Sequence, residues 1–382
     1  MKTENDNKNL NVPNLRFPEF DGEWSFGKLK DIAILSKGSG ISKDQLSDYG
    51  KPCILYGELY TKYKSEIIKE VVSKTNIDNS GLVQSKANDV IIPCSGEAAI
   101  EIATARCVQM DNILLGGDLN VIRLKGHDGG YFAYQLNGKR KIDIAKVAQG
   151  VSVVHLYGEH LKRVKVAYPS LREQQKISSF LSLIDERIST QIKIIEDLKK
   201  LKSAICKILF EHCDRVSNIR LLGDICKITT GKLDANAMTD DGKYPFFTCA
   251  REDYKTDTFA FYGDSLLISG NGEIGIVKRY NGKFNAYQRT YVLQNFSENI
   301  EYLMYYIEYH LPKRVLKEKN VGAMPYIVLS TLSEMPIKMP DIKKQFEVNR
   351  TLTCLSELIE LNSKLKDSYT SQKSYLLAQM FI

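Results

Sequence analysis

The chain has 382 residues, 43% of them hydrophobic and 26% charged, which is typical of a globular protein with two or three domains. No apolar run approaches the ~20 residues needed to cross a bilayer, so the sequence excludes a membrane-spanning helix. The net charge of +7, from 53 Lys and Arg against 46 Asp and Glu, permits a nucleic-acid partner without requiring one.

Residues 1–23 are predicted to form an N-terminal tail. Met1 to Asn11 is polar and mixed in charge, and it lacks the apolar core of a targeting peptide. The eight cysteines include no Cys-x-x-Cys pair, which argues against a zinc ribbon or a thioredoxin-like site. We therefore expect a cytoplasmic protein with reduced thiols and no metal.

Residues 24–170 are predicted to form a first α/β domain. A β-rich run covers Asp89 to Ile92, and a helical stretch lies near Tyr131 to Val147. The turn Lys37-Gly-Ser-Gly40 could contact DNA, because glycine-rich turns with a lysine can hold a phosphate. The turn Cys94-Ser-Gly-Glu97 is a candidate because it matches the glycine loop around Asn271 in the second domain. Ordinary turns have the same composition. The candidate DNA-binding residues of this domain are Lys37, Ser39, Ser95 and Glu97.

Residues 171–213 are predicted to form a long helix with a coiled-coil seam. Apolar residues recur at alternating spacings of four and three, and no Gly or Pro occurs from Gln175 to Phe210. A helix of ~35 residues would be ~50 Å long. The first seam residues are Ile177, Leu181, Ile184, Ile188 and the polar Gln191.

Residues 214–340 are predicted to form a second α/β domain. Its expected strands are Asp264 to Ile268 and Ile276 to Tyr280, followed by a hairpin turn at Asn281-Gly282 and a helix over Glu301 to Lys319. The Gly270 to Gly275 segment matches G-x-G-x-x-G. A dinucleotide site would need a helix to follow, and a strand is expected instead.

Base readout requires Arg, Lys, Asn, Gln or small polar side chains that point into a groove. In the second domain Asn271 occupies a tight glycine loop, and Gln288-Arg289 lies between Tyr287 and Tyr291. In the alternative interpretation the two tyrosines belong to the core and Arg289 is a solvated strand residue. The candidate DNA-binding residues here are Thr230, Lys232, Arg251, Ser269, Asn271, Lys278, Gln288 and Arg289.

Residues 341–382 repeat the first long helix at an offset of 171 residues. Its seam contains Val348, Leu352, Leu355, Ile359 and Asn362. The polar interruptions coincide, since Gln191 falls on Asn362 and Lys202 on Lys373, and buried polar seam residues can determine register and partner. Two unrelated amphipathic helices on a globular core remain the alternative.

The regions before the two helices also correspond, which predicts an internal pseudo-twofold repeat of domain, helix, domain, helix. Trp24 to Ile32 is similar to Asn218 to Ile225, and Asn88 to Gly96 is similar to Gly263 to Gly270. The changing offset implies about 22 extra residues in the first domain. The sequence thus predicts two tandem α/β (α+β) domains separated by two long helices in an antiparallel coiled coil.

No catalytic motif is complete. Gly22 to Lys28 matches G-x-x-x-x-G-K, but Leu29 replaces the Ser or Thr that would hold magnesium. The chain contains no Asn-Pro-Pro-Tyr or Asp-Pro-Pro-Tyr segment, so adenine methylation is not expected here. We expect a protein without a catalytic centre.

The sequence resembles the specificity subunit of type I restriction–modification systems. The resemblance covers Val12 to Ile382. It is carried by the opening Val12-Pro-Asn-Leu-Arg-Phe-Pro-Glu-Phe20 with Glu23-Trp24, and by the duplicated helix starts at Pro169 to Gln175 and Pro340 to Gln345. The second start departs from the first, because Lys344-Gln345-Phe346 lacks the Gln-Gln pair. The two helices are therefore unequal as docking surfaces.

The resemblance implies that residues 24–170 and 214–340 are target recognition domains, each reading half of a split double-stranded DNA site. Residues 171–213 and 341–382 would be spacer helices that set the half-site distance. The subunit would join two methyltransferase and two restriction subunits. The chain would bind no cofactor itself, and those partners would bring S-adenosylmethionine, ATP and magnesium.

Two other classes compete with a DNA-specificity subunit. A stand-alone nuclease or nucleotide-dependent enzyme would show turnover as purified protein. A scaffold whose helices dimerise and whose domains bind peptides would lack salt-dependent binding to duplex DNA.

Overall fold

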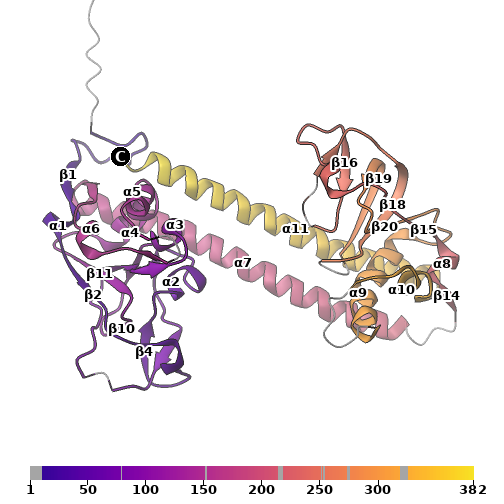
Figure 1. Cartoon of the computed structure of the whole chain (residues 1–382), viewed down its shortest axis with the longest axis horizontal. Coiled ribbons are helices and arrows are strands. Elements are labelled where there is room, and N and C mark those ends of the chain that lie inside the picture. The colour runs from indigo at the N-terminus through magenta and orange to yellow at the C-terminus, as the bar shows by residue number, and fades with distance from the viewer. Residues whose placement is uncertain are drawn as a thin grey trace, which may run out of the picture. The chain divides into compact units, whose positions relative to one another are not determined.

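The computed structural model of the chain describes residues 11–78, 80–150, 153–213, 218–250, 252, 254–272, 276–318 and 326–382. The chain splits into two compact units, unit 1 (Met1–Lys193 with Ser363–Ile382) and unit 2 (Ile194–Asn362). Both units share the two long helices, α7 (Leu171–Cys213) and α11 (Ile342–Gln379), which are pink and yellow in Figure 1. This division cuts through the helices, and the predicted division into domains and spacers stays a prediction.

Unit 1 contains a five-stranded sheet in the order β2-β11-β7-β9-β5, antiparallel except for the last pair. A smaller sheet, β10-β4-β6-β3, and two strand pairs, β1-β13 and β8-β12, accompany it. The elements before α7 are β1 (Ser25–Lys28), α1 (Leu29–Ile32), β2 (Ala33–Lys37), β3 (Leu46–Ser47), β4 (Lys51–Ile54), α2 (Glu58–Thr61), β5 (Ile67–Ile68), β6 (Ser73–Thr75), β7 (Asp89–Pro93), β8 (Ser95–Gly96), α3 (Ala99–Ile102), β9 (Arg106–Val108), β10 (Leu114–Leu115), β11 (Leu119–Leu124), α4 (Gly129–Asn137), α5 (Lys141–Lys146), β12 (Val154–His155), α6 (Gly158–Leu161) and β13 (Lys165–Tyr168).

Unit 2 contains a six-stranded sheet in the order β15-β20-β18-β19-β16-β17, with a strand pair β14-β21. The β19-β16 pair is parallel, as is the corresponding β9-β5 pair of unit 1. Its elements between the long helices are β14 (Ile219–Leu221), α8 (Leu222–Ile225), β15 (Lys227–Thr230), β16 (Tyr244–Phe247), β17 (Tyr254–Thr256), β18 (Phe261–Ser269), β19 (Val277–Ala286), β20 (Thr290–Gln294), α9 (Ile300–Glu318), α10 (Leu329–Ser333) and β21 (Pro336–Lys338).

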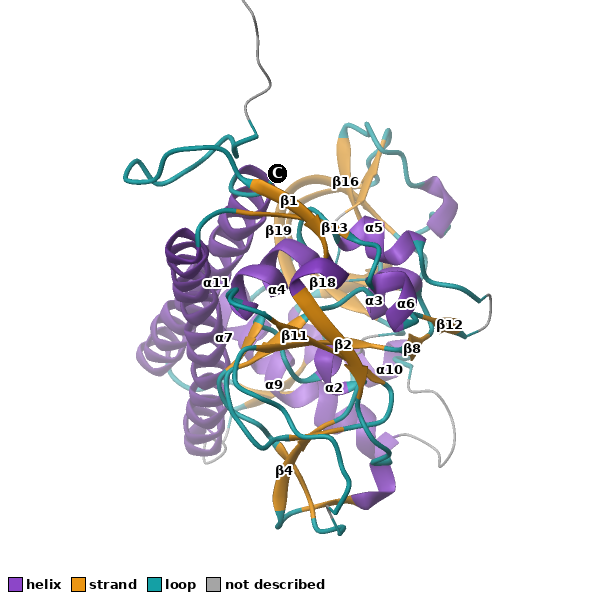
Figure 2. Cartoon of the chain, turned by 90° about the vertical axis from the view of Figure 1, so that its left-hand side faces the viewer, coloured by secondary structure: helices purple, strands orange, loops and turns teal. Residues whose placement is uncertain are grey.

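The two sheets therefore repeat one topology, in which β2-β11-β7-β9 corresponds to β15-β20-β18-β19. The extra length of unit 1 falls between β2 and β7, at residues 38–88, whereas residues 231–260 separate the corresponding β15 and β18 in unit 2. Several of these extra residues form the lobe around β4, which lies across the sheet from α4 in Figure 2. The tandem repeat predicted from the sequence is confirmed at the level of strand order.

Central strands are apolar at consecutive positions because both faces of each sheet are covered. On β7, Val90 and Ile92 join the core beneath α4, whereas Ile91 joins the opposite core with β4 and β11. On β18, Leu266 and Ile268 face α9 in the same way and Leu267 faces the other side.

Both long helices bury the seam that the sequence predicts. Among its first residues, Ile177, Leu181, Ile184 and Gln191 are buried and Ile188 is half-buried. In α11, Val348, Leu352 and Leu355 are buried, while Ile359 and Asn362 are half-buried. The antiparallel coiled coil stays a prediction.

The end of the predicted tail packs on unit 1. Arg16 forms a bidentate ion pair with Glu173 of α7, with both N–O distances 2.7 Å, and the Trp24 indole also donates to Glu173. Phe17 meets Phe180 edge-on. The backbone N–H of Leu15 donates to the Gln379 carbonyl at the end of α11. Residues 11–23 therefore tie the start of α7 to the end of α11 within unit 1.

One local prediction is wrong. The expected hairpin turn at Asn281-Gly282 lies inside β19, because that strand pairs with β18 along eight residues and Gly282 faces Gly263. The helical stretch expected near Tyr131 to Val147 is present as two helices, α4 and α5, which are separated at Gly138, whose N–H closes α4 on the Tyr134 carbonyl. The strand expected after Gly270 to Gly275 is β19, although residues 273–275 lie outside the described residues.

Candidate nucleic-acid interface

Most candidate DNA-binding residues of unit 2 lie at one end of its sheet. Strands β15 and β18 finish there, and their antiparallel neighbours β20 and β19 begin there. The backbone is tightly packed, since a Cβ on Gly231 would lie 2.0 Å from the Ala286 carbonyl oxygen and one on Gly270 would lie 2.5 Å from that of Arg289. Glycine at both positions lets the connecting loops meet.

At this end the candidates differ in what they offer a ligand. Thr230, Lys232, Gln288 and Arg289 are exposed, and Asn271 and Lys278 are half-buried. Ser269 is only 4% exposed, so its hydroxyl has little surface for a base. Arg251 lies outside the described residues. The exposed set combines cationic and amide donors, which are the groups that contact phosphates and base edges.

The equivalent end of unit 1 holds its candidates, but two of their side chains already have partners. Lys37 is exposed at the end of β2, and Glu97 is exposed beyond β8. The Ser39 hydroxyl accepts from the Val83 N–H at 2.6 Å, and the Ser95 hydroxyl donates to Asp118 at 3.2 Å. These serine hydroxyls therefore hold the loops in place, and Lys37 and Glu97 are the exposed candidates at this end.

Glycines in the first candidate turn serve backbone packing. A Cβ on Gly38 would lie 2.0 Å from the carbonyl oxygen of Gly116, and one on Gly117 would lie 3.3 Å from the Cα of Gly40. The turn from Lys37 to Gly40 is therefore held against residues 116–117. Close backbone packing therefore accounts for the glycines of this turn without a bound phosphate.

The cysteine thiols Cys94 and Cys53 of unit 1 are expected to be unreactive. Burial raises the pKa of Cys94, directly after β7, to about 11, and it does the same for Cys53 on β4. Thiols with such pKa values stay protonated near neutral pH and are poor nucleophiles. Among the described residues, no group of three or more His, Cys, Asp or Glu side chains is arranged to hold a metal ion.

Matched tyrosines on α4 and α9 hold the strands β13 and β21, which directly precede the two long helices. The Tyr131 hydroxyl donates to the Ala167 carbonyl at 2.8 Å, and the Tyr302 hydroxyl donates to the Lys338 carbonyl at 2.7 Å. Both tyrosines are buried, and the two bonds correspond at the 171-residue offset. The same offset relates Tyr134 to Tyr305, so a residue-by-residue search at this spacing could have found all four.

The glutamines of the duplicated helix starts have one shared role. The Gln174 amide donates to the Pro169 carbonyl at 2.8 Å, and the Gln345 amide donates to the Pro340 carbonyl at 2.9 Å. Both side chains are buried. Each glutamine satisfies a carbonyl that the turn before the helix leaves without a backbone partner, which explains the Pro-x-x-x-x-Gln spacing.

The two polar seam lysines have partners in their own units. Lys373 of α11 bridges Glu66 and Asp185, and its ammonium lies 5.6 Å from the Tyr134 ring centroid. Lys202 of α7 pairs with Glu308 at 3.3 Å and lies 5.3 Å from the Tyr305 ring centroid. These equivalent contacts explain why both seams are interrupted by lysine at the same position.

The comparisons with known proteins agree with this repeated architecture. Residues 21–200 and 217–369 match the family described as the type I restriction modification DNA specificity domain. The chain therefore belongs to this family, and it is a type I restriction–modification specificity subunit, a kind of subunit that is not catalytic. DNA sequence recognition follows from the family.

Two relatives show how the similarity is distributed. The specificity subunit of the type I restriction enzyme EcoDI from Escherichia coli is 37% identical over 139 residues, which are 36% of this chain and 31% of that one. The chain thus spans about a third of that relative's length. The MjaVIII specificity subunit from Methanocaldococcus jannaschii is 22% identical, and the match covers 95% of this chain and 92% of that one.

Solved structures support the fold. The crystal structure of a type I restriction-modification S subunit from M. genitalium superimposes with a TM-score of 0.68 at 18% identity, covering 97% of this chain and 99% of that one. A second solved structure, from work on assembly and conformational transition of the type I R-M system, has a TM-score of 0.54 at 13% identity. In the described part of the chain, no helix is both long and apolar enough to span a membrane.

Proposed function

We propose that the chain reads a bipartite double-stranded DNA site, with one half-site bound at the sheet end of each unit. The observation that supports this proposal is the repeated sheet, whose equivalent ends carry different side chains in the two units. Two ends with one geometry and different side chains suit two half-sites of different sequence. Each mismatched base pair would cost ~1–3 kcal/mol, so two reading surfaces multiply specificity.

In this proposal the chain directs two methyltransferase subunits and two restriction subunits to the site. The support is family membership, since the relatives are specificity subunits of type I restriction enzymes. The chain itself would bind no cofactor. S-adenosylmethionine, ATP and magnesium would be bound by the partner subunits, with adenine as the methylated base.

The long helices would set the distance between half-sites. α7 has 43 residues and α11 has 38. Inserting one heptad into both helices keeps each seam in phase and lengthens each helix by ~10 Å, equivalent to ~3 base pairs. The half-site sequences should stay the same while their spacing grows. Unchanged spacing in a folded, active variant would contradict the role of the helices as spacers.

Single-molecule sequencing of genomic DNA tests the proposed function. The chain would be expressed with a type I methyltransferase subunit in cells that have no other adenine methylase. A split motif methylated on adenine should appear only when the chain is present. If a verified complex produces no new methylation, the chain fits a protein-interaction scaffold better.

A further inference from the structure

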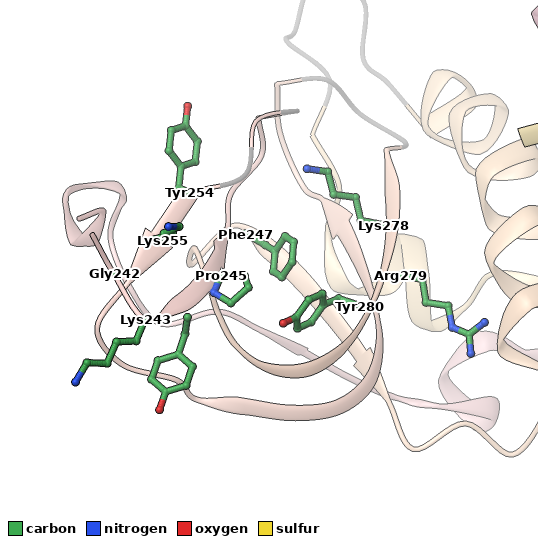
Figure 3. A pocket seen from close by; sticks show the side chains of 10 residues that line it. Gly242, Lys243, Pro245, Phe247, Tyr254, Lys255, Lys278, Arg279 and Tyr280 are labelled. Carbon is green, nitrogen blue, oxygen red and sulfur yellow. The ribbon is translucent and has the colours of Figure 1, made fainter. Parts of the chain in front are cut away.

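Unit 2 contains a pocket of about 600 Å³ between β16, β17 and the first half of β19. The side chains around it are shown in Figure 3. Its lining residues are Gly242, Lys243, Tyr244, Pro245, Phe247, Tyr254, Lys255, Lys278, Arg279 and Tyr280. This volume is in the range of pockets that hold a small molecule of nucleotide size.

Aromatic rings form much of the lining. The Phe247 and Tyr280 ring centroids are 5.2 Å apart, and both rings pack on the buried Phe284 at 5.6 Å. Tyr244 and Tyr254 are half-buried at the same pocket. Aromatic side chains bind nucleobases by stacking, because every base has a π face.

The charges of the pocket are cationic. Lys278 and Tyr280 lie on one face of β19, on the side of the strand away from Arg279 in Figure 3. The Lys278 ammonium lies 5.9 Å from the Phe247 ring centroid. Arg279 points the other way and pairs with Asp264 at 2.7 and 3.0 Å.

Lys243 and Lys255 are exposed at the same pocket. No carboxylate is among its lining residues, all of which the structure describes. The carboxylate of Glu252 instead accepts from the Tyr254 hydroxyl at 2.9 Å. The site therefore combines aromatic surface with positive charge, which suits an anionic ligand that carries an aromatic ring.

The pocket is joined to the candidate DNA-binding end of the sheet. The Phe247 carbonyl accepts from the Tyr287 N–H at 2.9 Å and from the Thr290 hydroxyl at 3.3 Å. The loop between those two residues contains Gln288 and Arg289. Lys278 belongs both to this end and to the pocket. A DNA strand bound at Gln288 and Arg289 would therefore pass beside the aromatic rings.

We propose that this pocket takes one nucleotide of the target DNA after its base has left the helical stack. In a paired duplex the faces of each base are covered by its neighbours, so only an unstacked base can use the aromatic lining. The base would stack on the rings, and the lysines would neutralise the adjacent phosphate. This inference rests on the proposed DNA-reading function and adds a specificity-determining site in unit 2.

The test measures binding of the full chain, without partner subunits, to duplexes that carry the methylated motif. A single mismatch is placed at each position of the half-site read by unit 2, because a mismatched base is easier to extrude. We expect one position at which the mismatch tightens binding by about ten-fold. Tyr254→Ala and Lys278→Ala should each reduce this gain to below about two-fold. Tyr262→Ala removes an exposed tyrosine outside the lining and should keep the full gain.

Each remaining outcome has a separate meaning. Binding to the matched duplex with no gain at any mismatch, or a gain that persists in both pocket variants, rejects the pocket and leaves the proposed function intact. Failure of the wild-type chain to bind any duplex overturns this inference, and the methylation experiment decides the proposed function separately. Saturable binding of deoxynucleoside monophosphates that Tyr254→Ala abolishes, without a mismatch gain, assigns the pocket to free nucleotides and overturns the inference.

Discussion

Unit 1 contacts the C-terminal part of α11 and unit 2 contacts the C-terminal part of α7, each through a lysine of that helix. The two lysines differ in how deeply their carboxylate partners are buried. Lys373 in unit 1 meets Glu66 and Asp185, whose side chains are both less than a tenth exposed. Lys202 in unit 2 meets Glu308, whose side chain is 45% exposed. Both units place a lysine ammonium near a tyrosine ring. Only the lysine of unit 1 also contacts two buried carboxylates.

The starts of the two helices differ in the same direction. In unit 1 residues 11–23 cover the first turns of α7 through Arg16 and Phe17. At the start of α11 in unit 2, Ile342 is 84% exposed and Phe346 is 69% exposed. The repeat thus keeps the buried framework of sheet, tyrosines and glutamines, while the surfaces around it have diverged. Differences that matter for partners should therefore lie outside the framework.

The largest expected effects come from the matched phenylalanines at the helix ends. Phe210 and Phe381 are fully buried, and they contact the equivalent Tyr302 and Tyr131 rings. Truncating either to alanine should destabilise its own unit by ~3–5 kcal/mol through lost burial and a residual cavity. Hydrogen exchange should show the loss in α9 for Phe210→Ala and in α4 for Phe381→Ala. Equal loosening of both helices by either variant would refute two separately packed units.

Replacing the seam lysine should cost more stability in unit 1 than in unit 2. Lys373→Met leaves two buried carboxylates without their ammonium partner, which should cost ~3–5 kcal/mol. Lys202→Met removes a pair with an exposed carboxylate and should cost less than ~1 kcal/mol. Urea unfolding of both variants measures the difference. Similar losses would mean that burial of the carboxylates does not distinguish the units.

The framework glutamines should give an intermediate effect. Gln174 donates to Pro169 and accepts from the Asp128 N–H at 3.0 Å, and its amide also lies 3.1 Å from Nδ1 of His127. Gln345 has only the Pro340 bond among the hydrogen bonds of the described residues that include its side chain. Because unsatisfied buried groups cost ~1–3 kcal/mol, Gln174→Ala should lie near the top of that range and Gln345→Ala near the bottom. Thermal unfolding of Gln174→Ala and Gln345→Ala measures the two losses of stability. Gln174→Glu and Gln345→Glu serve as controls that keep the size of the side chain.

The smallest effect is a pH dependence confined to unit 1. Burial lowers the pKa of His127 below its ordinary value of 6.5, against the opposing hydrogen bond from Gln174. Between the lowered pKa of His127 in the folded chain and its ordinary value of 6.5, the unfolded chain binds the proton and the folded chain does not. The free energy of unfolding therefore falls as the pH drops below 6.5. His127→Phe should flatten this slope, relative to the wild-type chain, when unfolding is measured between pH 5 and 8. An unchanged slope in His127→Phe would assign the effect to another group.

Local periodicity predicted the parts of this fold that depend on nearby residues. The seams of α7 and α11 follow from a heptad pattern, and the seam residues are buried or half-buried. The turn at Asn281-Gly282 was mispredicted because pairing with β18 overrode a strong local turn preference. The partners of Lys373 were beyond reach, since Glu66 lies 307 residues away in the chain.

The candidate interface was predicted less completely than the fold. Lys232, Gln288 and Arg289 lie at one sheet end because β15 and β18 run antiparallel to β20 and β19, and this strand order was not predicted from the sequence. The burial of Ser269 and the internal bond of Ser39 depend on how loops close, and no residue pattern encodes that closure. Which side chains contact bases stays a prediction.

The most direct measurement compares the methylated motif of the wild-type chain with that of a Gln288→Ala/Arg289→Ala double variant. Both are expressed with the same methyltransferase subunit, and the genomic DNA is sequenced at single-molecule level. If each unit reads one half-site, the variant should relax or change one half while the other half and the spacing stay as in the wild type. Changes in both halves, or an unchanged motif in a folded and active complex, would contradict independent reading by the two units.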